Sequence, residues 1–203
     1  MHGRERDFHH LMVDLRSELG LICGVLEVAL MRVDEVDCRE GRCGGDVGGS
    51  DAAQVAFLCR AARRRALAAA WRAPGVVDLP AIVTAMHDTV DLQRMGAATA
   101  RIAELRCRAH RIAAHGDAPL PGPHTDSGIP VIALIASLHH LLLNPDTGRA
   151  TDIRCTAEEV CELLTDARTG TTAGQRDILN AHRRIVQRAA DIAERHQRRS
   201  TAM

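Results

Sequence analysis

A repeated segment constrains the fold of this chain more than any other feature of its sequence. The segment Asp91 to Glu104, DLQRMGAATARIAE, has a weaker copy, AHRRIVQRAADIAE, which begins ninety positions later and ends at Glu194. Five pairs agree between the copies: Arg94 with Arg184, Ala100 with Ala190, Ile102 with Ile192, Ala103 with Ala193 and Glu104 with Glu194. Self-similarity at a fixed offset is the sequence mark of a repeat architecture. We therefore expect two related halves.

The near absence of aromatic residues indicates how those halves are built. Aromatic content is 1% over 203 residues, so the core has to come from Leu, Ala, Val, Ile and Met. Ala, Leu and Met are among the strongest helix formers. The composition therefore favours an all-α protein made of helical bundles.

Charge and cysteine usage exclude several classes of protein. The chain has no lysine, and its 26 arginines are balanced by 26 acidic residues, which argues against a nucleic-acid binder. No apolar run approaches the roughly 20 residues that span a bilayer, and no basic start precedes an apolar run, so we expect no membrane insertion and a cytoplasmic location. Seven cysteines without a CxxC pair predict neither a disulfide framework nor a zinc ribbon.

Apolar spacing and breaker residues predict three helices in the first half. The first is predicted from apolar residues at alternating steps of four and three: Phe8, Met12, Leu15, Leu19, Ile22, Leu26, Ala29 and Val33. The glycine-dense stretch from Gly41 to Ser50 should break the chain, so a second helix is expected from Asp51, as its N-cap, to Trp71. A third helix should run from about Asp78 to about His115.

Three further helices are predicted after a stretch rich in proline and glycine. That stretch, residues 116–130, is expected to be a linker. The helices should span about 131–143, 151–167 and 175–199, and the last carries a stripe of isoleucines at Ile178, Ile185 and Ile192. The predicted architecture is two tandem three-helix bundles, residues 1–115 and a degenerate second repeat, residues 131–203.

The third predicted helix resembles the PhoU family of phosphate-regulation proteins. Its Pro74-x-x-x-Asp78-Leu79 and Asp91-Leu92-Gln93-Arg94-Met95-Gly96 are similar to the family motif DLERMGDLAxxIAK. Arg94, Met95, Gly96, Ile102 and Ala103, with Asp91, are the matching residues that a helical scaffold could need. The first helix is similar to that of actinobacterial members, and the resemblance implies the six-helix repeat fold of a divergent member.

The resemblance also implies a function. It predicts a non-enzymatic cytoplasmic adaptor, often dimeric, between a phosphate ABC transporter, through its ATPase, and a sensor histidine kinase, which damps phosphate-starvation signalling when phosphate is plentiful. No nucleophile signature and no phosphate-binding glycine loop is present, so no catalytic residue and no cofactor site is expected.

The sequence departs from the family at its metal-binding positions. Family members commonly bind metal clusters through an E-x-x-x-D pair on the third helix of each half, where carboxylates four apart share a helix face. Those positions are Gln93 and Ala97 in the first half, and Arg183 and Gln187 in the second. An arginine cannot ligate a cation and repels it. We therefore expect the metal clusters to be lost.

Two other groups of residues leave alternatives open. His87, Asp88 and Asp91 are residual metal-ligand candidates, although a helix-surface ion pair between His87 and Asp91 is the commoner arrangement. Arginines also gather on the second and last helices, where they could meet an acidic partner or a phosphate, or form solvated faces. They are Arg60, Arg63, Arg64, Arg65, Arg183, Arg184, Arg188, Arg195, Arg198 and Arg199.

Three other functions compete with the phosphate-regulation hypothesis. The first is a metal-dependent helical enzyme or metal-binding helical protein that uses His87, Asp88 and Asp91. The second is a helical protein-interaction module unrelated to phosphate. The third, a nucleic-acid-binding module, is the least consistent with a net charge of zero.

Overall fold

The chain folds into helices at every segment where apolar periodicity predicts one. A computed structural model describes residues 2–35, 45–72, 78–114, 128–169 and 171–201. The helices are α1 (His2–Glu35), α2 (Gly45–Arg72), α3 (Leu79–Ala114), α4 (Gly128–Leu143), α5 (Thr147–Asp166) and α6 (Ala173–Thr201). The described residues contain no strand, so the all-α fold class is confirmed. None of these helices is long and apolar enough to cross a membrane.

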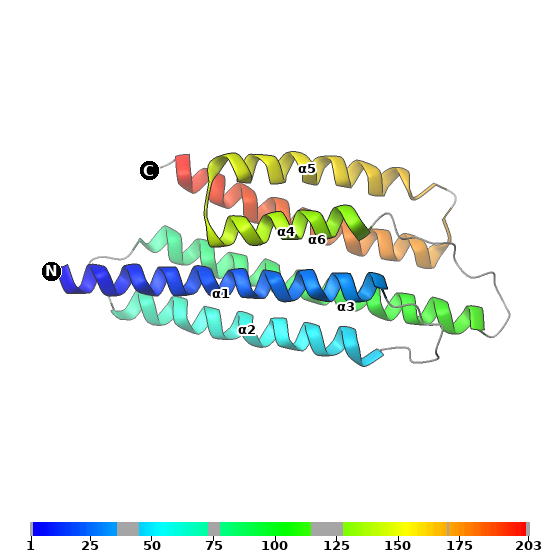
Figure 1. Cartoon of the computed structure of the whole chain (residues 1–203), viewed down its shortest axis with the longest axis horizontal. Coiled ribbons are helices and arrows are strands. Elements are labelled where there is room, and N and C mark those ends of the chain that lie inside the picture. The colour runs from blue at the N-terminus through cyan, green and yellow to red at the C-terminus, as the bar shows by residue number, and fades with distance from the viewer. Residues whose placement is uncertain (1, 36–44, 73–77, 115–127, 170, 202–203) are drawn as a thin grey trace.

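The six helices run along one common axis. In Figure 1, α2 lies at one edge of the molecule and α5 at the opposite edge, with the other four helices between them. α3 packs against both α2 and α6, while α1 packs against α2, α3 and α4. The start of α1 and the end of α6 lie at the same end of the molecule. The two helices that carry the repeated segment, α3 and α6, are therefore direct neighbours.

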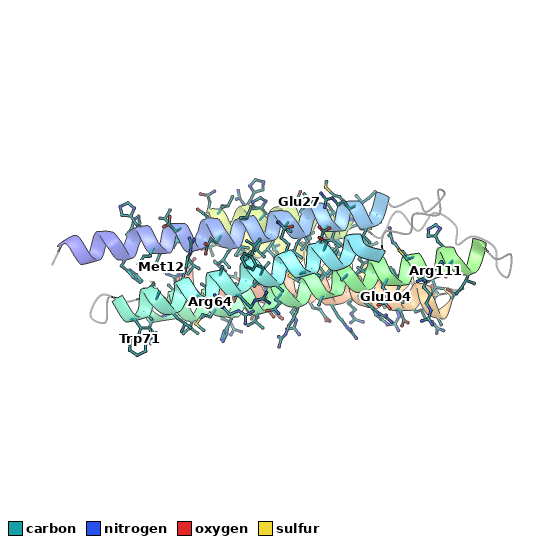
Figure 2. The ribbon with its side chains drawn as sticks, turned by 90° about the horizontal axis from the view of Figure 1, so that it is seen from below. Met12, Glu27, Arg64, Trp71, Glu104 and Arg111 are labelled. Carbon is teal, nitrogen blue, oxygen red and sulfur yellow. The ribbon has the colours of Figure 1, made fainter. Side chains whose placement is uncertain are left out.

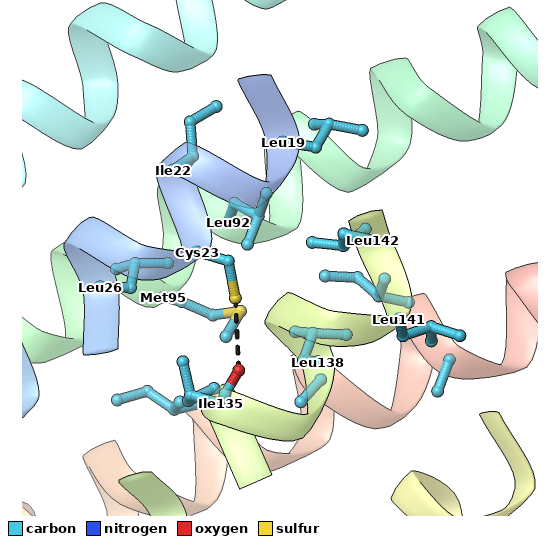
Figure 3. Close-up of a cluster of buried hydrophobic side chains, with 14 of the residues drawn as sticks. Leu19, Ile22, Cys23, Leu26, Leu92, Met95, Ile135, Leu138, Leu141 and Leu142 are labelled. Carbon is cyan, nitrogen blue, oxygen red and sulfur yellow. Dashed lines mark hydrogen bonds between the residues drawn. The ribbon is translucent and has the colours of Figure 1, made fainter. Parts of the chain in front are cut away.

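The apolar seam of α1 forms the centre of the core. All of its predicted members are buried except Phe8, which is half-buried and packs against the core. In Figure 3, Cys23 lies among Ile22, Leu26 and Leu138, and its thiol donates a hydrogen bond of 3.5 Å to the carbonyl of Ile135 on α4. Because this core is aliphatic, its shape depends on close helix contacts. Gly20 on α1 provides one, since a Cβ there would lie 2.5 Å from the side chain of Leu143 on α4.

Three helices begin three or more residues earlier than the sequence predicts, and α2 shows why. Asp51 is not the N-cap of α2, because the helix already starts at Gly45 and runs through Gly48 and Gly49. The side chain of Asp51 is buried and pairs with Arg32 of α1 at 3.2 Å. Tertiary contacts thus outweigh the low helix propensity of glycine. The predicted break is wrong from Gly45 onward, and residues 41–44 lie outside the described structure.

The other two early starts have local reasons. α4 begins at Gly128, so the last three residues of the predicted linker are helical, with Pro130 in the first turn, where its missing N–H costs no hydrogen bond. α5 begins at Thr147, because the carboxylate of Asp146 accepts the N–H of Arg149 at 2.9 Å as an N-cap. Residues 116–127 lie outside the described structure, and the division into two repeats stays a prediction.

Candidate functional site

A buried charge cluster lies where α3 crosses α6, at and just beyond the ends of the repeated segments. On α3, Asp88 and Asp91 lie one turn apart and face α6. The side chain of Asp88 is 0% exposed and that of Asp91 is 6% exposed. α6 runs antiparallel to α3, because contacts join the start of one helix to the end of the other, as in the Asp78–Arg199 ion pair. This arrangement brings Arg195 and His196, near the end of α6, to the two carboxylates.

Arg195 binds both carboxylates at once. Its Nε donates to Oδ1 of Asp88 at 3.1 Å, and its Nη2 donates to Oδ2 of Asp91 at 2.7 Å. The other oxygen of Asp88, Oδ2, lies 2.9 Å from Nε2 of His196. Each buried oxygen of Asp88 therefore has a partner from α6, which is the condition for a buried carboxylate to be tolerated.

Two more arginines lie beside Asp91, on the exposed side of these residues. Oδ1 of Asp91 lies 3.4 Å from Arg94 on the same helix and 3.5 Å from Arg188 of α6. Burial alone would lower the pKa of Arg195, but the two carboxylates outweigh it and raise that pKa above its ordinary value. Arg195 is therefore a permanent cation that clamps α3 to α6. We call Asp88, Asp91, Arg195 and His196 the interhelix charge cluster.

His87 does not join Asp91, so the predicted helix-surface ion pair is wrong. His87 is exposed, whereas Asp91 is buried against α6. Four residues rotate a helix by about 400°, which leaves the two positions about 40° apart. That difference is enough to place Asp91 within the contact with α6 and His87 outside it. Asp88 and Asp91 contact residues of α6, whereas His87 lies outside this contact. His87, Asp88 and Asp91 therefore do not come together as a set of metal ligands.

The positions of the family's metal ligands do not fit a metal ion. Oε1 of Gln93 accepts a hydrogen bond from Arg63 of α2, while Ala97 and Gln187 are exposed and bring no carboxylate. Arg183 is half-buried and lies beside the Cys161 thiol of α5, whose pKa burial raises and this guanidinium lowers. Among the described residues, no group of three or more His, Cys, Asp or Glu side chains could hold a metal. The donor set therefore lacks the hard oxygen ligands that such clusters need.

The remaining motif residues separate into core and surface positions. Met95, Gly96 and Ile102 are buried, and Ala103 packs against the core. A Cβ on Gly96 would lie 2.9 Å from the side chain of Val55, so this glycine lets α2 and α3 approach closely. Arg94, in contrast, is exposed and reaches back to Asp91.

A second buried polar group lies toward the other end of the α3–α6 contact. Arg106 of α3 donates to the carbonyl of Val33 at 2.6 Å and to Asp34 at 2.5 Å, which satisfies the end of α1. Beside it, His182 of α6 is buried, and its Nδ1 has no hydrogen-bond partner among the described residues. Burial and the nearby Arg106 lower the pKa of His182 to about 4. This histidine is therefore neutral at physiological pH.

Sequence reasoning missed these groups for a simple reason. The predicted alternatives for the arginines of the last helix were an acidic partner, a phosphate or solvent, yet Arg188, Arg195 and Arg199 pair with acids on α3 or directly before it. Partners about a hundred positions apart leave no local signal. The antiparallel approach of the two repeated segments was the missing information.

The chain is similar in sequence to two curated proteins. No protein-family model matches the chain. It is 28% identical over 148 residues to the phosphate-specific transport system accessory protein PhoU homolog 2 of Mycobacterium tuberculosis and to that of Mycobacterium bovis, covering 72% of this chain and 69% of each relative.

A solved structure matches over nearly the whole length. The fold is similar to the crystal structure of the phosphate transport system regulatory protein PhoU from Streptococcus pneumoniae, with a TM-score of 0.63 and 14% sequence identity. The match covers 98% of this chain and 96% of that structure. The chain therefore has the helical fold of this PhoU structure and is similar in sequence to curated PhoU proteins.

Proposed function

We propose that this chain is a non-enzymatic regulator of phosphate uptake and of phosphate-starvation signalling. One observation carries the proposal: the six helices match a phosphate transport system regulatory protein over 98% of this chain. The curated relatives are accessory proteins of phosphate-specific transport. The buried charged residues that the structure describes pair with one another between helices. This arrangement suits a structural role for them, and it supports a function through binding partners.

The finer form of the proposal is an adaptor in the cytoplasm. The protein would contact a sensor histidine kinase and the ATPase of a phosphate ABC transporter, and would act as a monomer or homodimer by presenting helix faces to them. When phosphate is plentiful, the state of the transporter would be signalled to the kinase through a change in the contacts that the adaptor makes. The long, rigid α3–α6 pair, clamped by the interhelix charge cluster, suits a scaffold that holds two partners in a defined geometry.

Deleting the gene tests this function directly. A reporter driven by a phosphate-starvation promoter should be active in phosphate-rich medium after deletion, and re-expression of the intact chain should silence it. In parallel, the purified chain should bind the purified kinase and the purified transporter ATPase in a co-elution assay. An unchanged reporter together with no binding to either protein would rule the proposal out.

We also propose that the chain works without the metal clusters that the resemblance to the family implies. The four equivalent positions provide a glutamine bound by Arg63, an alanine, an arginine and an exposed glutamine. Elemental analysis of protein purified without chelators should show substoichiometric iron, manganese and zinc. Stoichiometric metal that is lost on Asp91→Ala would contradict this and would favour the metal-binding alternative.

A further inference from the structure

The outward face of α2 exposes most of the few aromatic side chains that the protein has. The chain contains two phenylalanines, one tryptophan and no tyrosine. Yet Phe57 is 64% exposed and Trp71 is 84% exposed, both on α2. Figure 2 shows Trp71 pointing away from the neighbouring helices. Large apolar side chains are normally the first to be buried, so this exposure is costly unless another molecule covers them.

These side chains belong to a regular stripe along the helix. Phe57, Arg60, Arg64, Leu67 and Trp71 follow one another at steps of three and four residues, and all five are exposed. We call these five residues the α2 stripe. Steps of three and four are the spacing at which one helix packs along another. At 1.5 Å per residue the stripe is about 21 Å long, which matches roughly four turns of a partner helix.

The stripe is not required for the core of the protein. The opposite face of α2 buries small apolar residues, Val55, Cys59, Ala62, Ala66 and Ala69, in the core cluster. α2 is also an edge helix, in contact with α1 and α3. Its outer face is therefore open along its length.

The charge of the stripe determines what can bind there. No acidic residue occurs between Asp51 and Asp78. Within the described residues, the neighbouring Arg63 and Arg65 are held by Gln93 and Glu18, whereas Arg60 and Arg64 form no ion pair. An occupant has to bring apolar side chains for Phe57, Leu67 and Trp71 and carboxylates for the two arginines.

Two other occupants fit these observations poorly. A second copy related by a two-fold axis through the stripe would place Arg64 against its own equivalent, since Arg64 is the central residue, and like charges repel. A helix that lies in a membrane surface separates its apolar and basic residues onto different faces. Here the arginines interrupt the apolar residues along a single stripe.

We propose that the α2 stripe is the docking site for an acidic amphipathic helix of a partner protein. Tryptophan and arginine, which are enriched among the residues that dominate the energetics of protein interfaces, are both exposed on the stripe. Trp71 would insert between apolar residues of the partner helix, and Arg60 and Arg64 would each bind a carboxylate on it. The inference stands on α2 alone and goes beyond the proposed role in phosphate regulation, so either can fail without the other.

The single tryptophan makes the test direct, because the intrinsic fluorescence of the full chain reports on the stripe. The probe is a synthetic 21-residue helical peptide, about six turns, without aromatic residues, that carries leucine at steps of three and four with glutamate beside them. Titration should shift the Trp71 emission to the blue and shield it from a soluble quencher. The same peptide with lysine in place of glutamate should produce no shift.

Matched variants separate the charge of the stripe from the charge of the whole protein. Arg60→Glu/Arg64→Glu should weaken peptide binding about tenfold or more, and Arg60→Lys/Arg64→Lys should retain most of it. The control Arg176→Glu/Arg184→Glu makes the same charge change at exposed positions of α6 and should bind like the unmodified chain. Phe57→Ala keeps the reporter and should also weaken binding. Circular dichroism checks that each variant is folded.

Three results would overturn the proposal. The first is a blue shift with vesicles of phosphatidylglycerol and phosphatidylcholine but not with the peptide, which would assign the stripe to membranes. The second is a shift that depends on the concentration of the protein alone, which would assign it to self-association. The third is peptide binding that is absent, or that the α2 and α6 charge reversals weaken equally.

Discussion

Replacing Arg195 by leucine should lower the free energy of unfolding by about 3–5 kcal/mol, because it leaves two buried carboxylates without their shared cation. Asp88 is fully buried and would keep His196 as its only strong partner from α6, while Asp91 would keep Arg94 and Arg188 at 3.4 and 3.5 Å. A loss of this size in a protein of about 200 residues lowers Tm by roughly 2–4 °C per kcal/mol, or about 6–20 °C in total.

The repeat within the chain suggests substitutions that should restore the lost stability. At the offset of ninety positions, the residues equivalent to Asp88 and Asp91 are Ile178 and Ala181 in the second half, and the residue equivalent to Arg195 is Leu105 in the first half. The triple variant Asp88→Ile/Asp91→Ala/Arg195→Leu removes the buried charges together with their clamp. Replacing a complete buried ion pair by apolar residues is often neutral or stabilising by about 1–4 kcal/mol. The triple variant should therefore be at least as stable as the unmodified protein.

Urea unfolding followed by circular dichroism measures both effects, with the slope of each transition used to confirm that the variants unfold in the same way. The reasoning fails if Arg195→Leu costs less than about 1 kcal/mol, the range of an exposed ion pair. It also fails if the triple variant is as unstable as the single one, since the cost would then come from lost packing and not from unpaired charge.

Two further predictions concern single side chains. Gly96→Ala should destabilise the protein by about 1 kcal/mol despite alanine's higher helix propensity, because the new Cβ would meet Val55 at 2.9 Å and force α2 outward. Gly49→Ala, whose Cβ would meet nothing within 4 Å, should instead stabilise by about 0.5–1 kcal/mol, and equal effects in urea unfolding would refute the steric account. The pKa of His182 is lowered to about 4, so the unfolded chain binds the extra proton first and stability should fall as pH drops from about 6.5 toward 4, by up to about 3 kcal/mol. In His182→Leu that part of the pH dependence should disappear, whereas an unchanged profile would show that other groups, such as the carboxylates, dominate.

Much of the fold was predictable from the sequence because it depends on local periodicity. The seam from Met12 to Val33 identifies α1 and its buried face, and the repeated segment predicts that α3 and α6 are equivalent helices. Helix starts were less predictable. Asp51 resembles an N-cap locally, but its burial against Arg32 is a contact between helices, which no local pattern contains.

The candidate site was predictable only in its parts. Gln93, Ala97, Arg183 and Gln187 could be recognised from the sequence as positions that have lost metal-binding carboxylates, since ligand chemistry is a property of residue type. Asp88, Asp91 and Arg195 could be recognised as charged residues, but the ion pairs between them could not be predicted. Whether a charge on a helix meets solvent or a counter-ion depends on which helix lies beside it.

The sequence by itself therefore determined the all-α class, the approximate positions of the helices and the resemblance to PhoU proteins, because helix periodicity and sequence motifs are encoded within short stretches of chain. Only the tertiary structure decided that α3 and α6 pack antiparallel. That contact buries two aspartates under one arginine, while the position of α2 at the edge of the bundle leaves its aromatic and basic stripe uncovered. Burial and ion pairing depend on distances between segments that are remote in the chain, and those distances exist only once the bundle has formed.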